Sequence, residues 1–159
     1  MNASRWVQKT GPLGLYALAR FLTRHHPRVL MYHRFSQVEK PGCVSVATFE
    51  KQVHYVCRHH QPMALGELIQ RLRRKEPIPA NTIVMTVDDG YADFHDVAWP
   101  ILKAHGVPAT LFVTTGFVDG ELWLWPDQIT WLLNQAPVEM QAFNVAGQSI
   151  ARTPDAWQA

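Results

Sequence analysis

The most constraining feature of this sequence is the stretch TIVMTVDDGY, residues 82–91, in which two adjacent acids follow a run of apolar and β-branched residues. Such a run, bounded by turn-forming residues, predicts a buried β-strand. Successive side chains of a strand point to opposite faces, so Asp88 and Asp89 could not both face one ligand if the strand continued. Gly90 gives the backbone the freedom to turn, which lets both carboxylates converge on one centre. Two carboxylates at such a short separation repel each other, and a bound cation ordinarily relieves that repulsion.

The same acids could instead belong to a simple turn that caps the following helix. The surrounding pattern favours a site, because apolar runs at 28–33 and 109–115 predict two further strands with helical spacing between them. Helical crossovers return the chain to the same end of a sheet, so this order predicts an α/β domain with parallel strands. Ligands of such sheets lie beyond the C-terminal strand ends, where five polar residues fall: His33, Asp88, Asp89, Thr114 and Thr115.

Three helices are expected between these strands. Their predicted ranges are 48–60 with Thr48 as N-cap, 65–75, and 97–106 with Pro100 in the first turn and Gly106 at the end. Their spacing predicts core faces formed by Phe49, Val53, Val56 and Cys57 in the first helix and by Leu65, Leu68, Ile69 and Leu72 in the second. Near the C-terminus, residues 138–145 and 148–152 flank Ala-Gly, which predicts a β-hairpin.

Composition limits the functional classes. The chain has 159 residues, of which 47% are hydrophobic and 18% charged, and this is typical of a globular domain with one core. A formal net charge of +2 lacks the basic excess of a nucleic-acid binder. Cys43 and Cys57 lack CxxC spacing and are interpreted as reduced thiols.

The N-terminal segment resembles a signal peptide only superficially. Arg5 and Lys9 precede an apolar run at 13–22, but that run contains Arg20, is followed by basic residues and is too short to span a bilayer. We therefore expect a cytoplasmic protein without a transmembrane segment, with peripheral membrane contact through this segment as an open alternative.

The motif TVDDGY resembles the first signature of the polysaccharide deacetylase (NodB homology) family, similar to carbohydrate esterase family 4, with Val87 in place of the usual phenylalanine. The resemblance extends over residues 28–135 through four further stretches in the same order: LMYHRF, TFEKQV, GVPATLFVTTGF and LWLWPDQITWLL. It implies an α/β fold, a distorted (β/α) barrel of about seven or eight strands. The implied activity is metal-dependent hydrolysis of N-acetyl groups, or occasionally O-acetyl groups, on acetylated amino-sugar polysaccharides or oligosaccharides.

The resemblance also implies roles for individual residues. Asp88 corresponds to the general base, Asp89 to a ligand of a divalent metal, expected to be zinc, and the backbone N–H of Tyr91 to an oxyanion donor. His33, in MYHRF, matches the acid of relatives that deacetylate poly-N-acetylglucosamine, although a histidine can also serve a structural role at a strand end. Trp125, with Trp123, is a candidate for stacking on sugar rings, and core packing is the equal alternative.

Several family features are missing from the sequence. The second metal motif, H-[ST]-x-x-H, is absent, as are the later arginine and leucine-histidine motifs, and no two of the eight histidines stand four residues apart. A complete barrel needs on the order of 200 residues or more. We therefore expect a partial barrel, truncated after about three strands, that is inactive alone and self-associates through an exposed sheet edge.

The expected organisation has three parts: a helical, basic segment at 1–27, the N-terminal half of a NodB-like domain at 28–136, and the start of an insertion at 137–159. A non-catalytic glycan-binding or scaffold protein with the same fold is the main alternative to an enzyme. A nucleotide-binding domain is disfavoured because the sequence has no glycine-rich phosphate loop.

Overall fold

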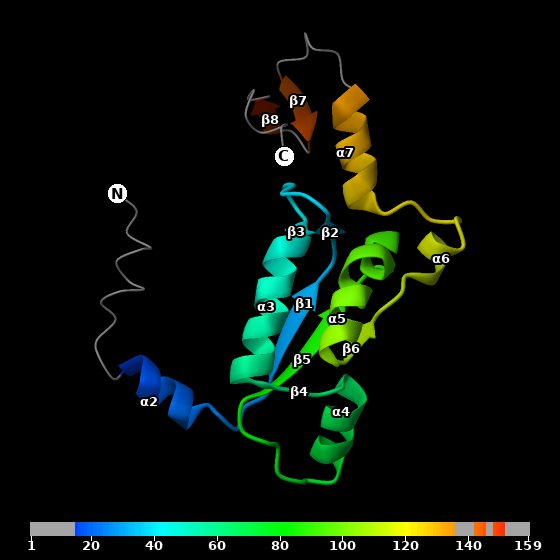
Figure 1. Ribbon diagram of the computed structural model, residues 1–159. Coiled ribbons are helices and arrows are strands. Elements are labelled where there is room, and N and C mark those ends of the chain that lie inside the picture. Colours follow the sequence, from blue (N-terminus) through cyan, green and yellow to red (C-terminus); the bar gives the residue numbers. More distant parts are fainter. Residues whose placement is uncertain (1–14, 136–141, 146–147, 152–159) are drawn as a thin grey trace.

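The computed structural model describes residues 15–135, 142–145 and 148–151 (Figure 1). Its centre is a parallel sheet of β1 (Arg28–Tyr32), β4 (Gln61–Pro62), β5 (Thr82–Val87) and β6 (Ala109–Leu111). Every pairing in this sheet is made with β5, which confirms the predicted α/β class and the parallel strands. The two-residue strand β4 was not predicted, because Gln-Pro carries no strand signal of its own.

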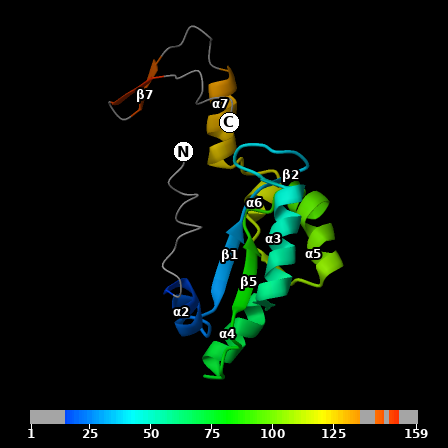
Figure 2. The same ribbon diagram turned by 60° about the vertical axis from the view of Figure 1, so that its left-hand side comes forward.

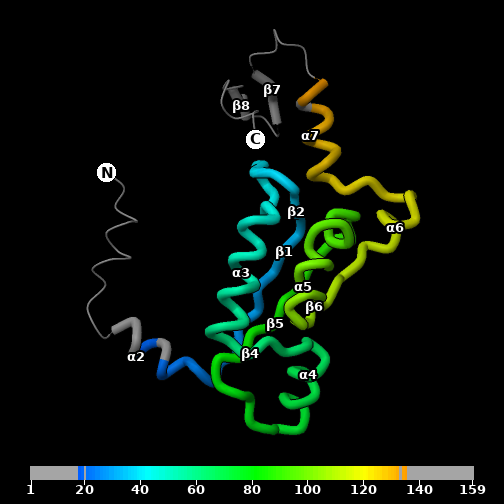
Figure 3. Tube along the Cα trace, in the orientation of Figure 1, coloured from blue at the N-terminus to red at the C-terminus, as the bar shows by residue number. Residues whose placement is uncertain are grey.

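The register brings the C-terminal ends of three strands level. Tyr32 of β1 and Leu111 of β6 both lie beside Val87, the last residue of β5. Polar residues that follow these strands therefore emerge at one edge of the sheet, and the chain can be followed to this edge in Figure 3.

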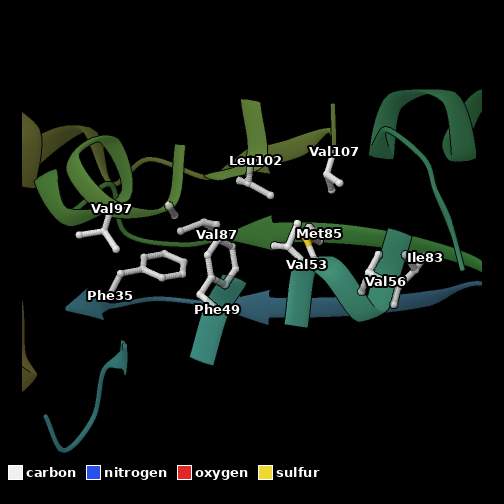
Figure 4. Packing of buried hydrophobic residues seen from close by; sticks show 11 residues of the cluster. Phe35, Phe49, Val53, Val56, Ile83, Met85, Val87, Val97, Leu102 and Val107 are labelled. Carbon is white, nitrogen blue, oxygen red and sulfur yellow. The ribbon is translucent and has the colours of Figure 1, made fainter. Parts of the chain in front are cut away.

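One face of the sheet is covered by α3 (Val46–His59) and by η1 (Phe94–Ala98) continuing into α5 (Trp99–His105) (Figure 2). Ile83, Met85 and Val87 of β5 point into this layer (Figure 4). They pack against residues from α3, η1 and α5, from the short strand that follows β1, and from the loop before β6, namely Phe35, Phe49, Val53, Val56, Val97, Ala98, Leu102 and Val107. The main core is thus a sandwich of one central strand and two helices.

The other face is only partly covered. Val84 packs with Met63 and with Leu68 of α4 (Leu65–Arg73), and these three buried residues form a second, smaller cluster. Val29 and Met31 of β1 remain 53% and 62% exposed on this face. Leu30 and Tyr32, which alternate with them, pack against the main core.

Helix α3 begins earlier than expected. Thr48 is not the N-cap, because the Ser45 side chain accepts a hydrogen bond from the Thr48 backbone N–H at 3.3 Å and satisfies it as a cap does. Phe49, Val53 and Val56 are buried as predicted. Cys57 is exposed, which corrects its assignment to the core face, because one residue beyond Val56 rotates it out of the buried stripe.

The remaining helices agree in part with the sequence. Leu68 is buried in α4, but Ile69 and Leu72 are exposed because little of the structure covers that helix beyond β5 and Met63. Pro100 occupies the first turn of α5 as expected. The π-helical turn before it was not expected; there the Trp99 N–H donates to the Phe94 carbonyl, which widens the helix at the point where proline removes a donor. Gly106 ends the helix in the left-handed conformation.

The strand predicted at 109–115 is shorter in the structure. β6 ends at Leu111. The Phe112 N–H still donates to the Val87 carbonyl at 2.8 Å, and the chain then leaves the sheet and enters the short helix α6 (Thr115–Val118). Helix α7 (Trp125–Gln135), which was not predicted, follows. β7 (Ala142–Val145) and β8 (Gln148–Ala151) pair antiparallel, as the hairpin signal predicted, while the residues joining them lie outside the described part.

Two small elements complete the description. β2 (Phe35–Ser36) and β3 (Val44–Ser45) pair in parallel beside the end of β1. Helix α2 (Leu15–Leu22) precedes β1, and the rest of the predicted segment at 1–27 before Leu15 lies outside the described residues. None of the helices in the described ranges is long and apolar enough to cross a membrane.

Candidate active site

The two acids lie where the central strand ends. The Asp88 backbone N–H donates to the Tyr32 carbonyl at 2.9 Å, which extends the β1–β5 ladder by one residue. The chain then turns, with φ of 74° at Asp89 and 85° at Gly90, and the Gly90 N–H returns to the Asp88 carbonyl at 3.0 Å. The turn predicted from the sequence is therefore present, and it breaks the strand alternation between the two carboxylates.

Glycine is required inside this turn for two reasons. The positive φ at Gly90 disfavours any residue with a Cβ. An added Cβ would also lie 3.2 Å from Val113 Cγ1 and 3.3 Å from Val118 Cγ2. The carbonyl of Asp89 accepts the Thr114 N–H at 3.3 Å, which ties the turn to the segment after β6.

His33 reaches the same edge from the neighbouring strand. Its Nε2 lies 3.8 Å from Asp88 Oδ2, and the two side chains are 46% and 27% exposed. This distance is beyond hydrogen-bonding range but within the cut-off for an ion pair if the imidazole is protonated. The placement of both groups at one end of the sheet agrees with the sequence prediction, and their catalytic roles stay predictions.

Tyr91 leaves the turn and is held by several neighbours. Its hydroxyl donates to Asp127 Oδ2 at 2.8 Å, and its ring lies 5.1 Å from the Phe117 ring in an edge-on arrangement. The Arg34 guanidinium carbon lies over the Tyr91 ring, 3.9 Å from its centroid. Burial first, and then the hydrogen bond and charge of Asp127, raise the pKa of Tyr91 to about 12.

Arg34 connects three parts of the chain. Its Nε donates to Asp93 Oδ2 at 2.8 Å and its Nη1 donates to Asp127 Oδ1 at 3.4 Å. Burial alone would lower the pKa of the Arg34 guanidinium, but the hydrogen bond to Asp93 and the attraction of that carboxylate raise it overall. Arg34 is therefore a permanent cation beside the two aspartates.

A cleft of about 430 Å³ opens beside these residues, within the usual range of ligand pockets, about 300–1,000 Å³. It runs from His33 and Asp89 between the turn 40–43 and the first turns of α7. The residues that line it are His33, Arg34, Lys40, Pro41, Gly42, Cys43, Asp89, Tyr91, Pro126, Asp127 and Thr130. Trp125 is 70% exposed and does not line it, whereas Trp123 pairs with Trp131 at 5.7 Å between ring centroids. The structure thus places Tyr91 at the cleft, whereas Trp125 is not among the residues that line it.

The metal-binding capacity of this region is incomplete. Asp89 lines the cleft and is available as a carboxylate ligand. Within the described part of the chain, however, no group of three or more His, Cys, Asp or Glu residues is placed to hold a metal ion. A zinc site takes three or four protein ligands, so these residues do not fit a complete one.

Sequence reasoning missed Arg34, Asp93 and Asp127. Arg34 stands directly after His33, and Asp93 stands two residues after Tyr91, so both were close to recognised motifs. Asp127 lies 93 residues from Arg34 and shares no local pattern with it. Only the folded arrangement reveals that the three side chains meet.

Comparison with known proteins shows that the chain is similar to polysaccharide deacetylases. The sequence profile described as polysaccharide deacetylase matches residues 75–153, about half of the chain. The poly-beta-1,6-N-acetyl-D-glucosamine N-deacetylase of Escherichia coli (strain K12) is 33% identical over 60 residues, which are 38% of this chain and 9% of that protein. The enzyme of the same name from Staphylococcus aureus (strain MSSA476) is 30% identical over 78 residues, which are 49% of this chain and 27% of that protein.

A solved structure agrees with these relatives. IcaB from Ammonifex degensii superposes with a TM-score of 0.55 and 25% sequence identity, covering 68% of this chain and 48% of that one. The chain therefore spans less than a third of the two curated relatives and about half of the solved structure. The acids after β5, the histidine after β1, the matched profile and the shared fold are consistent with one another, and the chain belongs to the polysaccharide deacetylase family.

Proposed function

We propose that this chain provides the general base, the acid and one metal ligand of an enzyme that deacetylates acetylated amino-sugar polysaccharides or oligosaccharides. The observation that carries the proposal is the pair Asp88 and Asp89 at the end of the central strand, with His33 Nε2 at 3.8 Å from Asp88 Oδ2. A base and an acid on neighbouring strand ends can act on two atoms of one bound amide. The names of the curated relatives support an N-acetylated amino sugar as substrate.

The residues of this chain act in two proton transfers. Asp88 accepts a proton from the water that attacks the acetyl carbonyl carbon, and His33 donates a proton to the sugar nitrogen as the C–N bond breaks, which releases acetate and a free amine. The Tyr91 backbone N–H is proposed as a donor to the oxygen that becomes negative in between. No other hydrogen bond of that N–H is found among the described residues.

The proposal includes a divalent metal, with zinc the expected ion and Asp89 as one ligand. Since the described residues hold no complete set of ligands, the remaining donors would come from outside this part of the chain. Asp89 has a left-handed φ of 74°, so its backbone has left the extended conformation of the strand before it.

The decisive experiment compares two isosteric variants in the product of the whole gene that encodes this chain. Asp88→Asn should lower acetate release from N-acetylated oligosaccharides by about 10²–10⁴-fold, the usual contribution of a general base, while zinc affinity measured by calorimetry stays near wild type. Asp89→Asn should lower zinc affinity itself. Equal zinc affinity in the wild type and Asp89→Asn would overturn the division of roles, and oligosaccharide binding without any acetate release would support a glycan-binding protein instead.

We also propose that the chain self-associates through the exposed edge of the sheet at β1. Among the described residues, β1 pairs only with β5, so its other edge presents unpaired backbone groups beside the exposed side chains of Val29 and Met31. Analytical ultracentrifugation of the chain should show concentration-dependent dimers or larger species. A monomer at all concentrations would contradict this part of the proposal.

The proposed location is cytoplasmic or peripheral to a membrane. Helix α2 exposes Leu18, Phe21 and Leu22, and basic residues follow it at Arg24 and Arg28, a combination that suits a shallow contact with an anionic lipid surface. Flotation of the protein with anionic vesicles, compared with the variant Phe21→Ser, would test the peripheral alternative.

A further inference from the structure

We propose that Arg34 is a positioning residue that sets the distance between the two sides of the active site. One side is the end of β1, which carries His33, and the other is the turn that carries Asp88, Asp89 and Tyr91. This inference deepens the proposed function and rests on it for the kinetic outcome. Its structural outcome can be tested without any activity.

The spacing of the two proposed catalytic groups is not fixed by direct contact. His33 Nε2 and Asp88 Oδ2 are 3.8 Å apart, too far for a hydrogen bond between them, and the imidazole is nearly half exposed. Their separation therefore depends on the backbone that carries each group.

That backbone is fixed on both sides of His33. On the N-terminal side, the Tyr32 carbonyl accepts the Asp88 N–H at 2.9 Å, which joins the two strand ends. On the C-terminal side, the next residue is Arg34, whose Nε donates to Asp93 at 2.8 Å. His33 is thus held between a backbone bond to the start of the acidic turn and a side-chain bond to the helix that follows it.

Arg34 also holds the exit of the turn. Its guanidinium covers the Tyr91 ring at 3.9 Å, and its Nη1 donates to the same Asp127 carboxylate that accepts the Tyr91 hydroxyl. Asp127 consequently uses one oxygen for Arg34 and the other for Tyr91. The triangle of Arg34, Tyr91 and Asp127 fixes both the ring and the start of α7 relative to β1.

Lysine could not replace this arrangement. The guanidinium contacts two carboxylates through different nitrogens while its central carbon lies over an aromatic ring, and a single ammonium cannot make all three contacts from one position. Asp93 Oδ1 is buried without a hydrogen-bond partner among the described residues, so the bond from Arg34 to Oδ2 is the main compensation for burying this carboxylate.

The structural test uses the chain itself with backbone ¹⁵N relaxation. Arg34→Met should lower the order parameters of the Gly90 and Tyr91 amides from about 0.85, typical of rigid backbone, to below about 0.6, while those of the core residue Met85 stay unchanged. Arg34→Lys should give intermediate order parameters at Gly90 and Tyr91. This variant can be measured instead if Arg34→Met does not fold. The matched control is Arg71→Met, which removes an arginine paired with Glu67 on α4, away from the site.

The kinetic test uses the product of the whole gene. Arg34→Met should lower kcat by at least about tenfold with KM changed less than about threefold, because the residue orients proposed catalytic groups and does not act on the substrate itself. Arg34→Lys should recover part of kcat. Unchanged order parameters at Gly90 and Tyr91 in both Arg34 variants would overturn the inference, whereas an inactive wild type with the predicted loss of order would overturn only the proposed function.

Discussion

The two faces of the central sheet are buried to different degrees. On one face, Ile83, Met85 and Val87 are almost fully buried under α3 and α5, and the core there is continuous. On the other face, Thr82, Val84 and Thr86 of β5 are buried, with Val84 packed against α4, but Val29 and Met31 of β1 are more than half exposed. The first face is buried like the core of a globular domain. The second face leaves apolar side chains exposed that another element could cover.

This difference separates stability from function. The packing on the covered face holds β5 in place. The acidic turn with Asp88 and Asp89, which follows β5, is therefore positioned by the covered face. The cleft beside the turn is bounded by the turn 40–43 and α7, and the described residues do not supply a full set of metal ligands. The chain covers 48% of the IcaB structure.

The largest effect is expected when this chain is compared with the product of the whole gene. We expect residues 1–159 alone to release no measurable acetate from N-acetylated oligosaccharides and to bind zinc only weakly, because one carboxylate leaves most of the coordination sphere to water. Calorimetry with zinc and an acetate-release assay check both expectations. Submicromolar zinc affinity together with acetate release would show that other residues of this chain complete the site.

The next effect concerns the covered face. Phe49 of α3 is 1% exposed and packs against Phe35 and Tyr32, with ring centroids 4.8 and 5.3 Å away. Phe49→Ala should destabilise the fold by about 3–5 kcal/mol, because it removes buried apolar contacts and leaves a cavity. Urea unfolding followed by circular dichroism measures this loss, and a change below about 1 kcal/mol would mean that this core is less tightly packed than it appears.

The sequence predicted the covered face better than the site around the cleft. The strand at 82–87, its parallel neighbours and the buried residues of α3 follow from local periodicity, which the final packing preserves. The cap at Ser45 was missed because Thr48 is an equally good capping residue by type and only the backbone geometry distinguishes them. The contact of Arg34 with Asp127 was missed because it joins residues 93 apart, and no local pattern encodes such a pair.

A smaller effect is expected in the titration of Tyr91. Its folded pKa of about 12 lies above the value of about 10 for an unfolded tyrosine. The neutral phenol is therefore favoured by folding, and the associated stability is complete below about pH 10 and is lost as the pH rises from 10 towards 12. Asp127→Asn should lower the pKa of Tyr91, though not fully to 10, because burial remains the larger cause.

This titration can be followed by ¹³C NMR of labelled tyrosine, which separates the four tyrosines of the chain. Tyr91→Phe assigns the resonance, and Tyr55→Phe, at an exposed position, serves as the control. A Tyr91 pKa that does not change in Asp127→Asn would show that the hydrogen bond between them contributes little in solution.

The smallest effect on stability is expected on the open face. Met31 is 62% exposed, so Met31→Lys removes few buried contacts and should change the free energy of unfolding by no more than about 0.5 kcal/mol. The same substitution places a charge beside the unpaired edge of β1, and a lysine at such a position opposes edge-to-edge pairing. We therefore expect the variant to be more monomeric than the wild type in analytical ultracentrifugation while its unfolding curve stays the same. A loss of stability comparable to that of Phe49→Ala would mean that the open face is covered in solution, and the contrast between the two faces would then be wrong.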